Sequence, residues 1–237
     1  GGRPPEASRA DVCVIACAEA WRGDGAILAS PMGLIPSLGA RLARLTFAPD
    51  LLLTDGDAYL VDRDGNVEGW LPYAKVFTML AAGRRHVMMG AVQIDRHGNQ
   101  NISCIGDWQR PKAQLLGVRG APGNTVNHAV SYWIPRHSKR VFTEHVDMVS
   151  GVGYDRGATD LRVVVTNLAV LDFDTPGHTM RLRSVHPGVD VADVVNETSF
   201  ELVVPDDVAV TREPAAAELE FIRQLDPGGT RDKEVPC

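Results

Sequence analysis

The hydrophobic residues in the first half of the chain follow two alternating patterns. In segments 10–22, 32–45 and 73–82, apolar residues recur at every third or fourth position, which is typical of helices with one buried face. Short apolar runs at 26–30, 51–54 and 86–94 are bounded by turn residues, as expected for buried strands. This alternation predicts an α/β fold with an open, mainly parallel sheet flanked by helices.

The second half of the chain contains more predicted strands than helices. Strands are expected at 101–105, 140–149, 161–174 and 180–185. Helices are expected to begin near Asn124–Asn127, to follow the cap residue Asp190, and to cover 215–225. Because no internal repeat divides the sequence, residues 1–237 are predicted to form a single domain, with flexible termini at about 1–8 and 227–237.

Charge and hydropathy exclude two classes of partner. The net charge is −6, and acidic and basic residues are interleaved, so no basic patch is dense enough to follow a nucleic-acid backbone. No apolar run approaches the roughly 20 residues that a membrane-spanning helix needs, and the first residues lack the apolar core of a signal peptide. We therefore expect a cytoplasmic protein with neither nucleic acid nor a membrane as partner.

The sequence contains none of the common short motifs for cofactor or metal chemistry. Patterns for dinucleotide binding, for the phosphate-binding P-loop, for zinc proteases and for serine hydrolases are absent. The four cysteines form no CxxC pair and are expected to be buried thiols: Cys13, Cys17, Cys104 and Cys237. The seven histidines show no metal-ligand spacing, so no metal site is predicted.

Two aspartates directly follow the predicted strand at 51–54. Asp55 and Asp57 lie in the sequence TDGDA. Ligands of open parallel sheets bind at the carboxyl ends of strands, so either carboxylate is a candidate catalytic group. Asp-Gly is also the most common signal for a two-residue turn, so a plain turn remains the alternative interpretation.

Amide side chains cluster just after the predicted strand at 86–94. Gln93 and Asn99, together with Asn101, offer fixed donors and acceptors to a substrate. In the alternative interpretation, Gly98 and Asn99 only bend the chain between two strands.

A glycine-rich segment, 117–133, leads into a predicted helix. Backbone N–H groups near Gly120 and Gly123 would be exposed at the helix start, which suits an oxyanion or a phosphate. Asn124 either belongs to this donor site or only caps the helix. A comparable turn at His186-Pro187-Gly188 is interpreted as turn chemistry alone.

Five segments in a fixed order resemble the beta subunit of glutaconate-type class I coenzyme A transferases. They are GAVQIDRHGNQNIS at 90–103, the glycine-rich turn with Asn127, and the segments 136–154, 163–174 and 184–189. Segments 69–90 and 119–133 are particularly similar to the beta subunit of the IpdAB-type hydrolases, which are transferase-like enzymes of bacterial steroid degradation.

This resemblance implies a fold of the NagB/RpiA/CoA-transferase-like type and a heteromeric enzyme. The implied partner is an alpha subunit, in a heterotetramer of two alpha and two beta chains, and the implied substrate is an acyl-CoA bound at the alpha–beta interface. No other cofactor is implied, because coenzyme A is part of the substrate.

In the transferases of this family, a Glu at the end of the strand that corresponds to LLLT attacks the thioester. Residues 51–58 contain no Glu, and Asp is one methylene shorter, which misplaces a nucleophile. The IpdAB-type resemblance instead implies hydrolysis, in which a retro-Claisen cleavage opens the last ring of a steroid-derived CoA thioester (a cholesterol ring).

The same resemblance leads to a set of expected roles. The main catalytic carboxylate is assigned to the alpha subunit, while this chain supplies backbone donors at 120–124, Asn127 as an orienting group, and Asp55 or Asp57 in the pocket wall. The aromatic residues Trp133, Trp70 and Tyr73 either line the pocket for an apolar ring system or pack in the core.

Three other functions fit part of the pattern. A true CoA-transferase would move CoA between organic acids, and a non-catalytic scaffold would only complete the pocket of the alpha subunit. A regulator that binds sugar phosphates on the same broad fold is disfavoured, because the chain has no DNA-binding segment.

Overall fold

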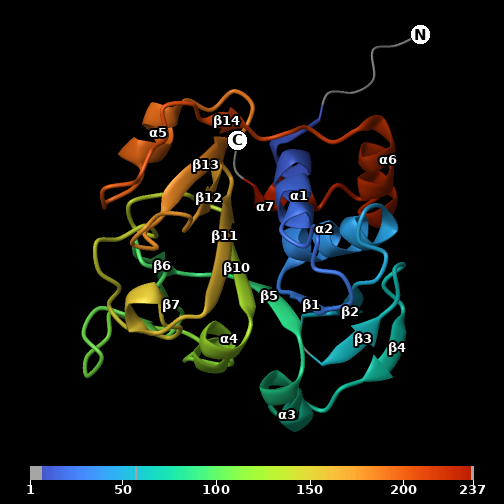
Figure 1. The fold of residues 1–237 in the computed structure, drawn as a ribbon, viewed down its shortest axis with the longest axis horizontal. Helices are drawn as coiled ribbons and strands as arrows, with labels where there is room; N and C mark the ends of the chain where they lie inside the picture. Colours follow the sequence, from blue (N-terminus) through green and yellow to red (C-terminus); the bar gives the residue numbers. More distant parts are fainter. Residues whose placement is uncertain (1–6, 57, 236–237) are drawn as a thin grey trace.

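A ten-stranded sheet forms the centre of the protein, with the order β14-β13-β12-β11-β10-β5-β1-β2-β3-β4 (Figure 1). The structure is a computed structural model, and it describes residues 7–56 and 58–235. The helices are α1 (Arg9–Glu19), α2 (Leu34–Leu45), α3 (Tyr73–Ala82), α4 (Ala121–Asn127), α5 (Val191–Asn196), α6 (Ala216–Leu225) and α7 (Arg231–Glu234), with a 3-10 turn at Tyr154–Arg156.

The strands of the large sheet are short. They are β1 (Leu28–Pro31), β2 (Leu52–Thr54), β3 (Tyr59–Val61), β4 (Val67–Trp70), β5 (Arg85–Met89), β10 (Ala129–Ile134), β11 (Asp160–Thr166), β12 (Ala169–Asp172), β13 (Arg181–Val185) and β14 (Ala209–Val210). Two small two-stranded sheets lie outside it, β6 (Gln93–Ile94) with β7 (Gln100–Asn101) and β8 (Cys104–Ile105) with β9 (Ala113–Gln114).

The middle of the large sheet is parallel. Strands β2, β1, β5, β10 and β11 pair in parallel, whereas β3 with β4 and β12 with β13 extend its two sides through antiparallel pairs. Parallel strands need helical crossovers, which α2, α3 and α4 provide. The predicted α/β fold with an open, mainly parallel sheet is therefore confirmed.

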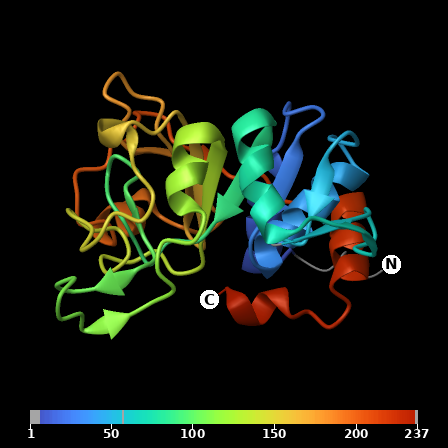
Figure 2. The same ribbon diagram turned by 90° about the horizontal axis from the view of Figure 1, so that it is seen from below.

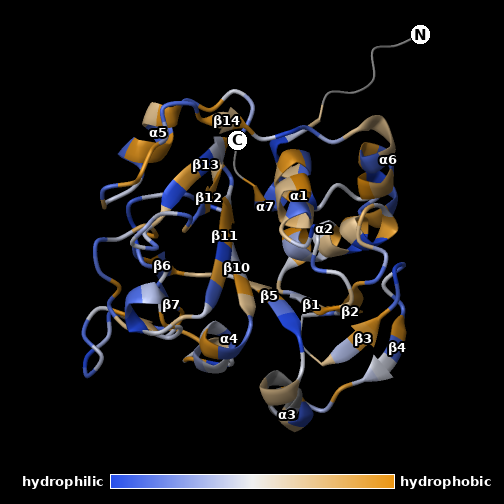
Figure 3. Ribbon diagram, in the orientation of Figure 1, coloured by the Kyte–Doolittle hydropathy of each residue, from blue (hydrophilic) through white to orange (hydrophobic). Residues whose placement is uncertain are grey.

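Two hydrophobic clusters lie on opposite faces of this sheet. Alternate residues of one strand enter different clusters: Met88 packs with α1 and α2, whereas Val87 and Met89 pack on the side of α4. Figure 3 shows hydrophobic residues gathered along the central strands and α1, while the peripheral loops are mostly hydrophilic. No helix in the described residues combines the length and the apolar character needed to cross a membrane.

Three predicted strands are divided in the structure. The run at 86–94 ends as β5 at Met89, and the chain then leaves the sheet before β6. The run at 101–105 contributes only its two ends to strands, one to β7 and one to β8. The run at 161–174 forms the antiparallel hairpin of β11 and β12, because the Thr166 hydroxyl accepts the N–H groups of Leu168 and Ala169 and turns the chain. The apolar pattern of these runs could not reveal the breaks.

Two further predictions in the second half of the chain were wrong. Segment 140–149 contains no strand and makes one isolated bridge, from Phe142 to Ile94, because its apolar residues cover β6 from an irregular loop. The helix expected to begin at Asn124–Asn127 instead ends there. Gly120 precedes α4 as its N-cap, so Asn124 is not the cap residue.

The C-terminal segment is attached to the N-terminal helix by buried charges. Arg231 donates to the carboxylates of Asp11 at 2.7 Å and Asp226 at 3.1 Å, and all three side chains are buried. Glu234 accepts a hydrogen bond from the indole of Trp133. Within the C-terminal segment expected to be flexible, Arg231 thus makes a buried contact that the polar, Gly/Pro-rich composition does not indicate. Ser8 caps α1, and residues 1–6, 236 and 237 lie outside the described part.

Removing the Arg231 guanidinium should destabilise the protein strongly. Arg231→Ala would leave two buried carboxylates without a cation, at a cost of about 3 kcal/mol or more. Burial raises the pKa of Asp226, but the hydrogen bonds from Arg231 and Thr230 outweigh it, so the pKa is lowered. The stability that the ionised Asp226 contributes is therefore lost as the pH falls below about 4. Thermal and urea unfolding would measure it, with Lys233→Ala on the exposed side of α7 as the control. Equal stability of the two variants would contradict the assignment.

Candidate active site

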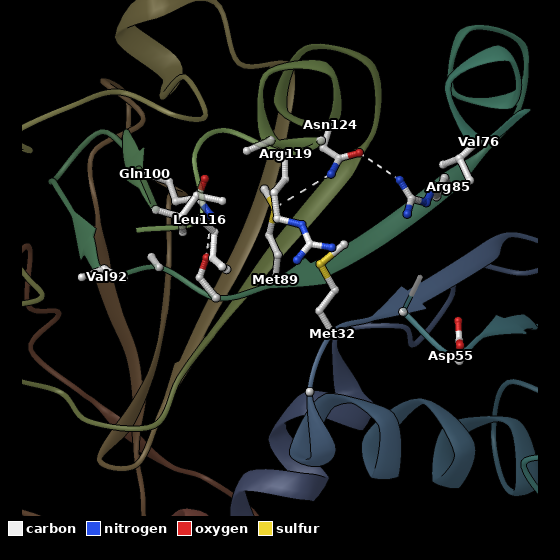
Figure 4. Close-up of a pocket in the computed structure, with 17 residues that line it drawn as sticks. Met32, Asp55, Val76, Arg85, Met89, Val92, Gln100, Leu116, Arg119 and Asn124 are labelled. Atoms are coloured by element: carbon white, nitrogen blue, oxygen red, sulfur yellow. Dashed lines mark hydrogen bonds between the residues drawn. The ribbon is translucent and has the colours of Figure 1, made fainter. Parts of the chain in front are cut away.

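A cavity of about 500 Å³ opens where several central strands end. Its wall includes the residues that follow β1, β2 and β5, one residue of α3, and the turn that precedes α4 (Figure 4). The wall is mostly apolar, with Met32, Val76, Met89, Ile102 and Leu116 among its residues. Cavities with apolar walls and a few polar groups are typical small-molecule sites, and the carboxyl ends of parallel strands are their usual position.

A glycine brings the ends of β1 and β2 together at this cavity. Gly56 has a φ of +89°, and a Cβ atom at this position would lie 2.3 Å from the carbonyl oxygen of Pro31. Only glycine fits this contact, because a side chain would collide with the backbone of the neighbouring strand. The TDGDA turn is therefore shaped by its contact with β1 as well as by its own sequence.

Asp55 agrees with both interpretations of the TDGDA segment, a turn and a group in the cavity wall. Its carboxylate accepts the N–H of Tyr59 at 3.1 Å, and its own N–H donates to the Tyr59 carbonyl, so it holds the turn between β2 and β3. It also lines the cavity, and it is the only carboxylate among the described residues that do so. Asp57, the second candidate, lies outside the described residues.

Two arginines at the cavity were not predicted from the sequence. The first, Arg85, is buried at the start of β5. Its guanidinium donates to the Ser30 hydroxyl at 2.8 Å and to the side-chain amide oxygen of Asn124 at 2.9 Å, so β1 and α4 fix its position. His128 lies nearby, and burial together with the positive charge of Arg85 lowers its pKa to about 4. His128 is therefore neutral at physiological pH.

The second arginine, Arg119, lies at the mouth of the cavity and has a strained backbone. Its φ is +47°, in the left-handed region that costs a residue with a Cβ atom roughly 1–2 kcal/mol. Figure 4 shows its side chain extended across the cavity toward Met32. Strained residues cluster at functional sites, where the conformation positions a side chain. The sequence signal was weak, since Arg119 only lies between two glycines of the turn.

The glycine-rich turn is divided between the cavity and the surface. Gly120 and Asn124 line the cavity, and the Asn124 amide bonds the Arg85 guanidinium and approaches the Met89 sulfur. Gly123 and Asn127 do not line it, because the exposed Asn127 amide folds back on the Gly123 carbonyl. The structure thus brings only the first half of the predicted donor site to the cavity.

The two other predicted amides hold loops together. Gln93 accepts hydrogen bonds from Asn101 and from the N–H of Asp147, and Asn99 donates to Asp95 and Asp155. Neither lines the cavity, so the structure supports the turn interpretation for both. A neighbour that was not predicted, Gln100, does line it and donates to the Gly90 carbonyl.

The aromatic candidates whose side chains the structure describes lie away from the cavity. Trp133 is buried on the opposite face of the sheet, as the core-packing alternative predicted. Trp70 is exposed on the edge strand β4, and the side chain of Tyr73 lies outside the described part. Cys13, Cys17 and Cys104 are buried free thiols, as predicted, and Cys237 is outside the described residues.

Taken together, the cavity offers cationic and amide donors in an apolar wall. Such an arrangement stabilises a negatively charged oxygen that forms during a reaction, because the low-polarity surroundings strengthen the interaction. The described residues that line the cavity include one carboxylate, on the exposed Asp55 at the rim, and no histidine.

Comparisons with known proteins agree with this geometry. The family model for coenzyme A transferase matches residues 75–197, more than half of the chain. The chain therefore belongs to the coenzyme A transferase family. A glutaconate CoA-transferase chain of Acidaminococcus fermentans is a more distant relative, 31% identical over 159 residues that cover 62% of this chain and 59% of that protein.

Higher similarity defines the branch of the family. The chain is 53% identical over 245 residues to the cholesterol ring-cleaving hydrolase IpdB subunit of Rhodococcus jostii, with 97% of each chain covered. The crystal structure of IpdAB from Rhodococcus jostii RHA1 superposes with a TM-score of 0.93, covering 98% of this chain and all of the other. Within the coenzyme A transferase family, the chain thus belongs with the IpdB subunits.

The close contact at Gly56 generates a testable prediction. Gly56→Ala should lower the free energy of unfolding by about 2 kcal/mol or more, because the new methyl group meets the Pro31 carbonyl in a conformation that already disfavours side chains. Gly157→Ala is the matched control, since Gly157 has a φ of +97° but no atom within 4 Å of the added Cβ. The control should lose only about 1 kcal/mol. Equal losses in urea unfolding would show that the contact with β1 is unimportant.

Proposed function

We propose that this chain is the beta subunit of a heteromeric hydrolase that opens the last ring of a steroid-derived CoA thioester by retro-Claisen cleavage of a carbon–carbon bond. The observation that carries the proposal is the full-length likeness to an IpdB subunit of a cholesterol ring-cleaving hydrolase. The sequence adds a second argument, because the segment after β2 has Asp in place of the Glu that transfer chemistry uses.

The partner in this proposal is a CoA-transferase-like alpha subunit, in a complex of two alpha and two beta chains. Support comes from the IpdAB structure and from the hydrolase and transferase relatives, whose names each describe one subunit of a larger enzyme. A partner is also expected from the cavity, which is open at its mouth and has no buried carboxylate among its described lining residues. We further expect the enzyme to work in the cytoplasm.

The reaction requires a base, a water molecule and donors for negative charge. A base on the alpha subunit removes a proton from water, and the water oxygen bonds to the ring carbonyl carbon. The bond between this carbon and the carbon next to the thioester then breaks, and its electron pair forms the thioester enolate. The enolate takes a proton back, which leaves a new carboxylate and an intact thioester.

The cavity residues of this chain are assigned to charge stabilisation. Arg119 reaches across the mouth, where its guanidinium stabilises the oxyanion and then the enolate. Arg85 and Asn124 supply side-chain N–H donors deeper in the wall. Gly120 contributes its backbone to the wall at the turn before α4. Asp55 stays at the rim and holds the turn, whereas the predicted orienting role of Asn127 is not favoured by its exposed position.

The apolar wall fits the proposed substrate. A remaining steroid ring is a compact carbocycle, and burying it against Met32, Val76 and Met89 contributes roughly 25 cal/mol for each Å² of apolar surface removed from water. The cavity volume of about 500 Å³ lies in the range of small-molecule sites.

The test of the overall reaction uses the complex with its alpha subunit in water labelled with oxygen-18. With a cyclic β-keto acyl-CoA of steroid origin, mass spectrometry should show one solvent oxygen in a ring-opened product that retains the thioester. Release of free coenzyme A, or its transfer to added acetate or succinate without ring opening, would contradict the proposal in favour of a thioesterase or a transferase.

The role of Arg119 can be tested separately from folding. Arg119→Met should lower kcat roughly 100-fold while binding changes less, because one donor to the developing charge is lost. Arg119→Gly removes the side chain but relieves the left-handed strain, so it should be equally inactive and at least as stable. The control is Arg156→Met, which removes an exposed arginine on the 3-10 turn. Wild-type kcat in both Arg119 variants would exclude this role.

A further inference from the structure

A two-stranded arm extends from the mouth of the cavity. Strands β8 and β9 pair in antiparallel fashion, and Figure 2 shows them projecting away from the body of the protein. The chain that leaves β9 returns directly to the cavity, which Leu116 and Arg119 line. The arm and the cavity wall are therefore one continuous stretch of chain.

The arm is held in a defined shape. The N–H of Lys112 donates to the Ile105 carbonyl at 2.8 Å, and the N–H of Gly106 donates to the Asp147 carboxylate at 2.8 Å. At the tip, the Asp107 carboxylate accepts the N–H of Gln109 at 2.7 Å. The tip is thus a hydrogen-bonded turn, and the carboxylate of Asp107 accepts a hydrogen bond within it.

The tip presents an aromatic ring and cations to solvent. Trp108 is 61% exposed, although an indole of this size is normally buried. Arg110 and Lys112 are exposed as well, and like Arg119 they have no ion-pair partner among residues 7–56 and 58–235. Between Cys104 and Gly120 there are three basic residues and one acidic residue, a local charge of +2 in a chain of net charge −6.

We propose that this arm binds the nucleotide end of the acyl-CoA substrate, with Trp108 stacked on the adenine and Arg110 and Lys112 paired with its phosphates. The inference rests on the proposed function, since it assumes a coenzyme A thioester in the cavity. Aromatic rings stack on nucleobases, and exposed Arg and Lys attract phosphate.

The proposal also explains how an acidic chain binds a polyanionic substrate. A net charge of −6 repels coenzyme A at long range, but at physiological salt concentration charges interact over only about 8 Å. A local group of cations at the tip of an arm therefore provides attraction where the nucleotide lies, while the acyl group occupies the apolar cavity at the other end of the extended thioester.

The experiment compares two thioesters of the same acyl group on the assembled enzyme, one with coenzyme A and one with pantetheine, which lacks the nucleotide. The double variant Arg110→Ala/Lys112→Ala should raise KM for the CoA thioester about fivefold to tenfold and leave the pantetheine thioester unchanged. Trp108→Ala should raise the same KM roughly tenfold, and Trp108→Phe should restore most of it. The control is Lys139→Ala/Arg140→Ala, which removes one Lys and one Arg from another exposed loop.

Two outcomes would overturn the inference. If KM rises equally for both thioesters, the arm does not act on the nucleotide. If the arm variants lose the alpha subunit in analytical ultracentrifugation while the control complex stays intact, the arm is a subunit interface instead.

Binding of free coenzyme A and of pantetheine, measured by calorimetry, keeps the test independent of the reaction. Should the wild-type complex fail to open the ring, the proposed function fails. The arm assignment then still requires that the arm variants weaken binding of coenzyme A, and unchanged binding would refute it.

Discussion

The structure depends on side-chain hydrogen bonding in the long stretch of chain between β5 and β10, whose regular structure is limited to four two-residue strands and α4. After Gly90 the chain leaves the large sheet and returns to it only at β10. Buried backbone groups without a partner cost about as much as a lost hydrogen bond, so side chains must provide partners where the sheet does not. Gln93 and Asn99 do this by bonding to loops more than 50 residues away. The cavity wall and the arm are positioned through these bonds.

The need for hydrogen-bond partners from distant segments also explains which features the sequence could predict and which it could not. Periodicity revealed the alternating elements, and strand ends correctly located the TDGDA turn beside the cavity, since both follow from local patterns. The amides Gln93 and Asn99 were predicted to bind substrate because the sequence cannot distinguish an amide side chain that binds a substrate from one that binds a distant loop. Arg85 was missed for a different reason: it lies beside Arg84, just before the apolar run 86–94, and its direction toward Ser30 and Asn124 becomes visible only when three segments pack together.

The proposed enzyme divides opposite charges between two chains. This subunit contributes arginines and amides in an apolar wall, and the proposal assigns the base to the alpha subunit. A guanidinium beside a buried carboxylate in one chain would form an ion pair, which favours the ionised carboxylate and weakens it as a base. Placing the two groups on different subunits allows the substrate to lie between them. The strain at Arg119 agrees with this arrangement, because strained backbone conformations cluster at functional sites.

The buried bond between Asp11 and Arg231 also has a consequence for biosynthesis. The ribosome makes helix α1 long before Arg231, because 220 residues separate Asp11 from Arg231. Domains usually begin to fold while the chain is still being synthesised. Here the carboxylate of Asp11 has no Arg231 guanidinium to accompany it into the interior until those residues have been added. The native packing of α1 is therefore completed only after Arg231 has been made, and a nascent chain stalled before Arg231 would lack the cation that pairs with Asp11.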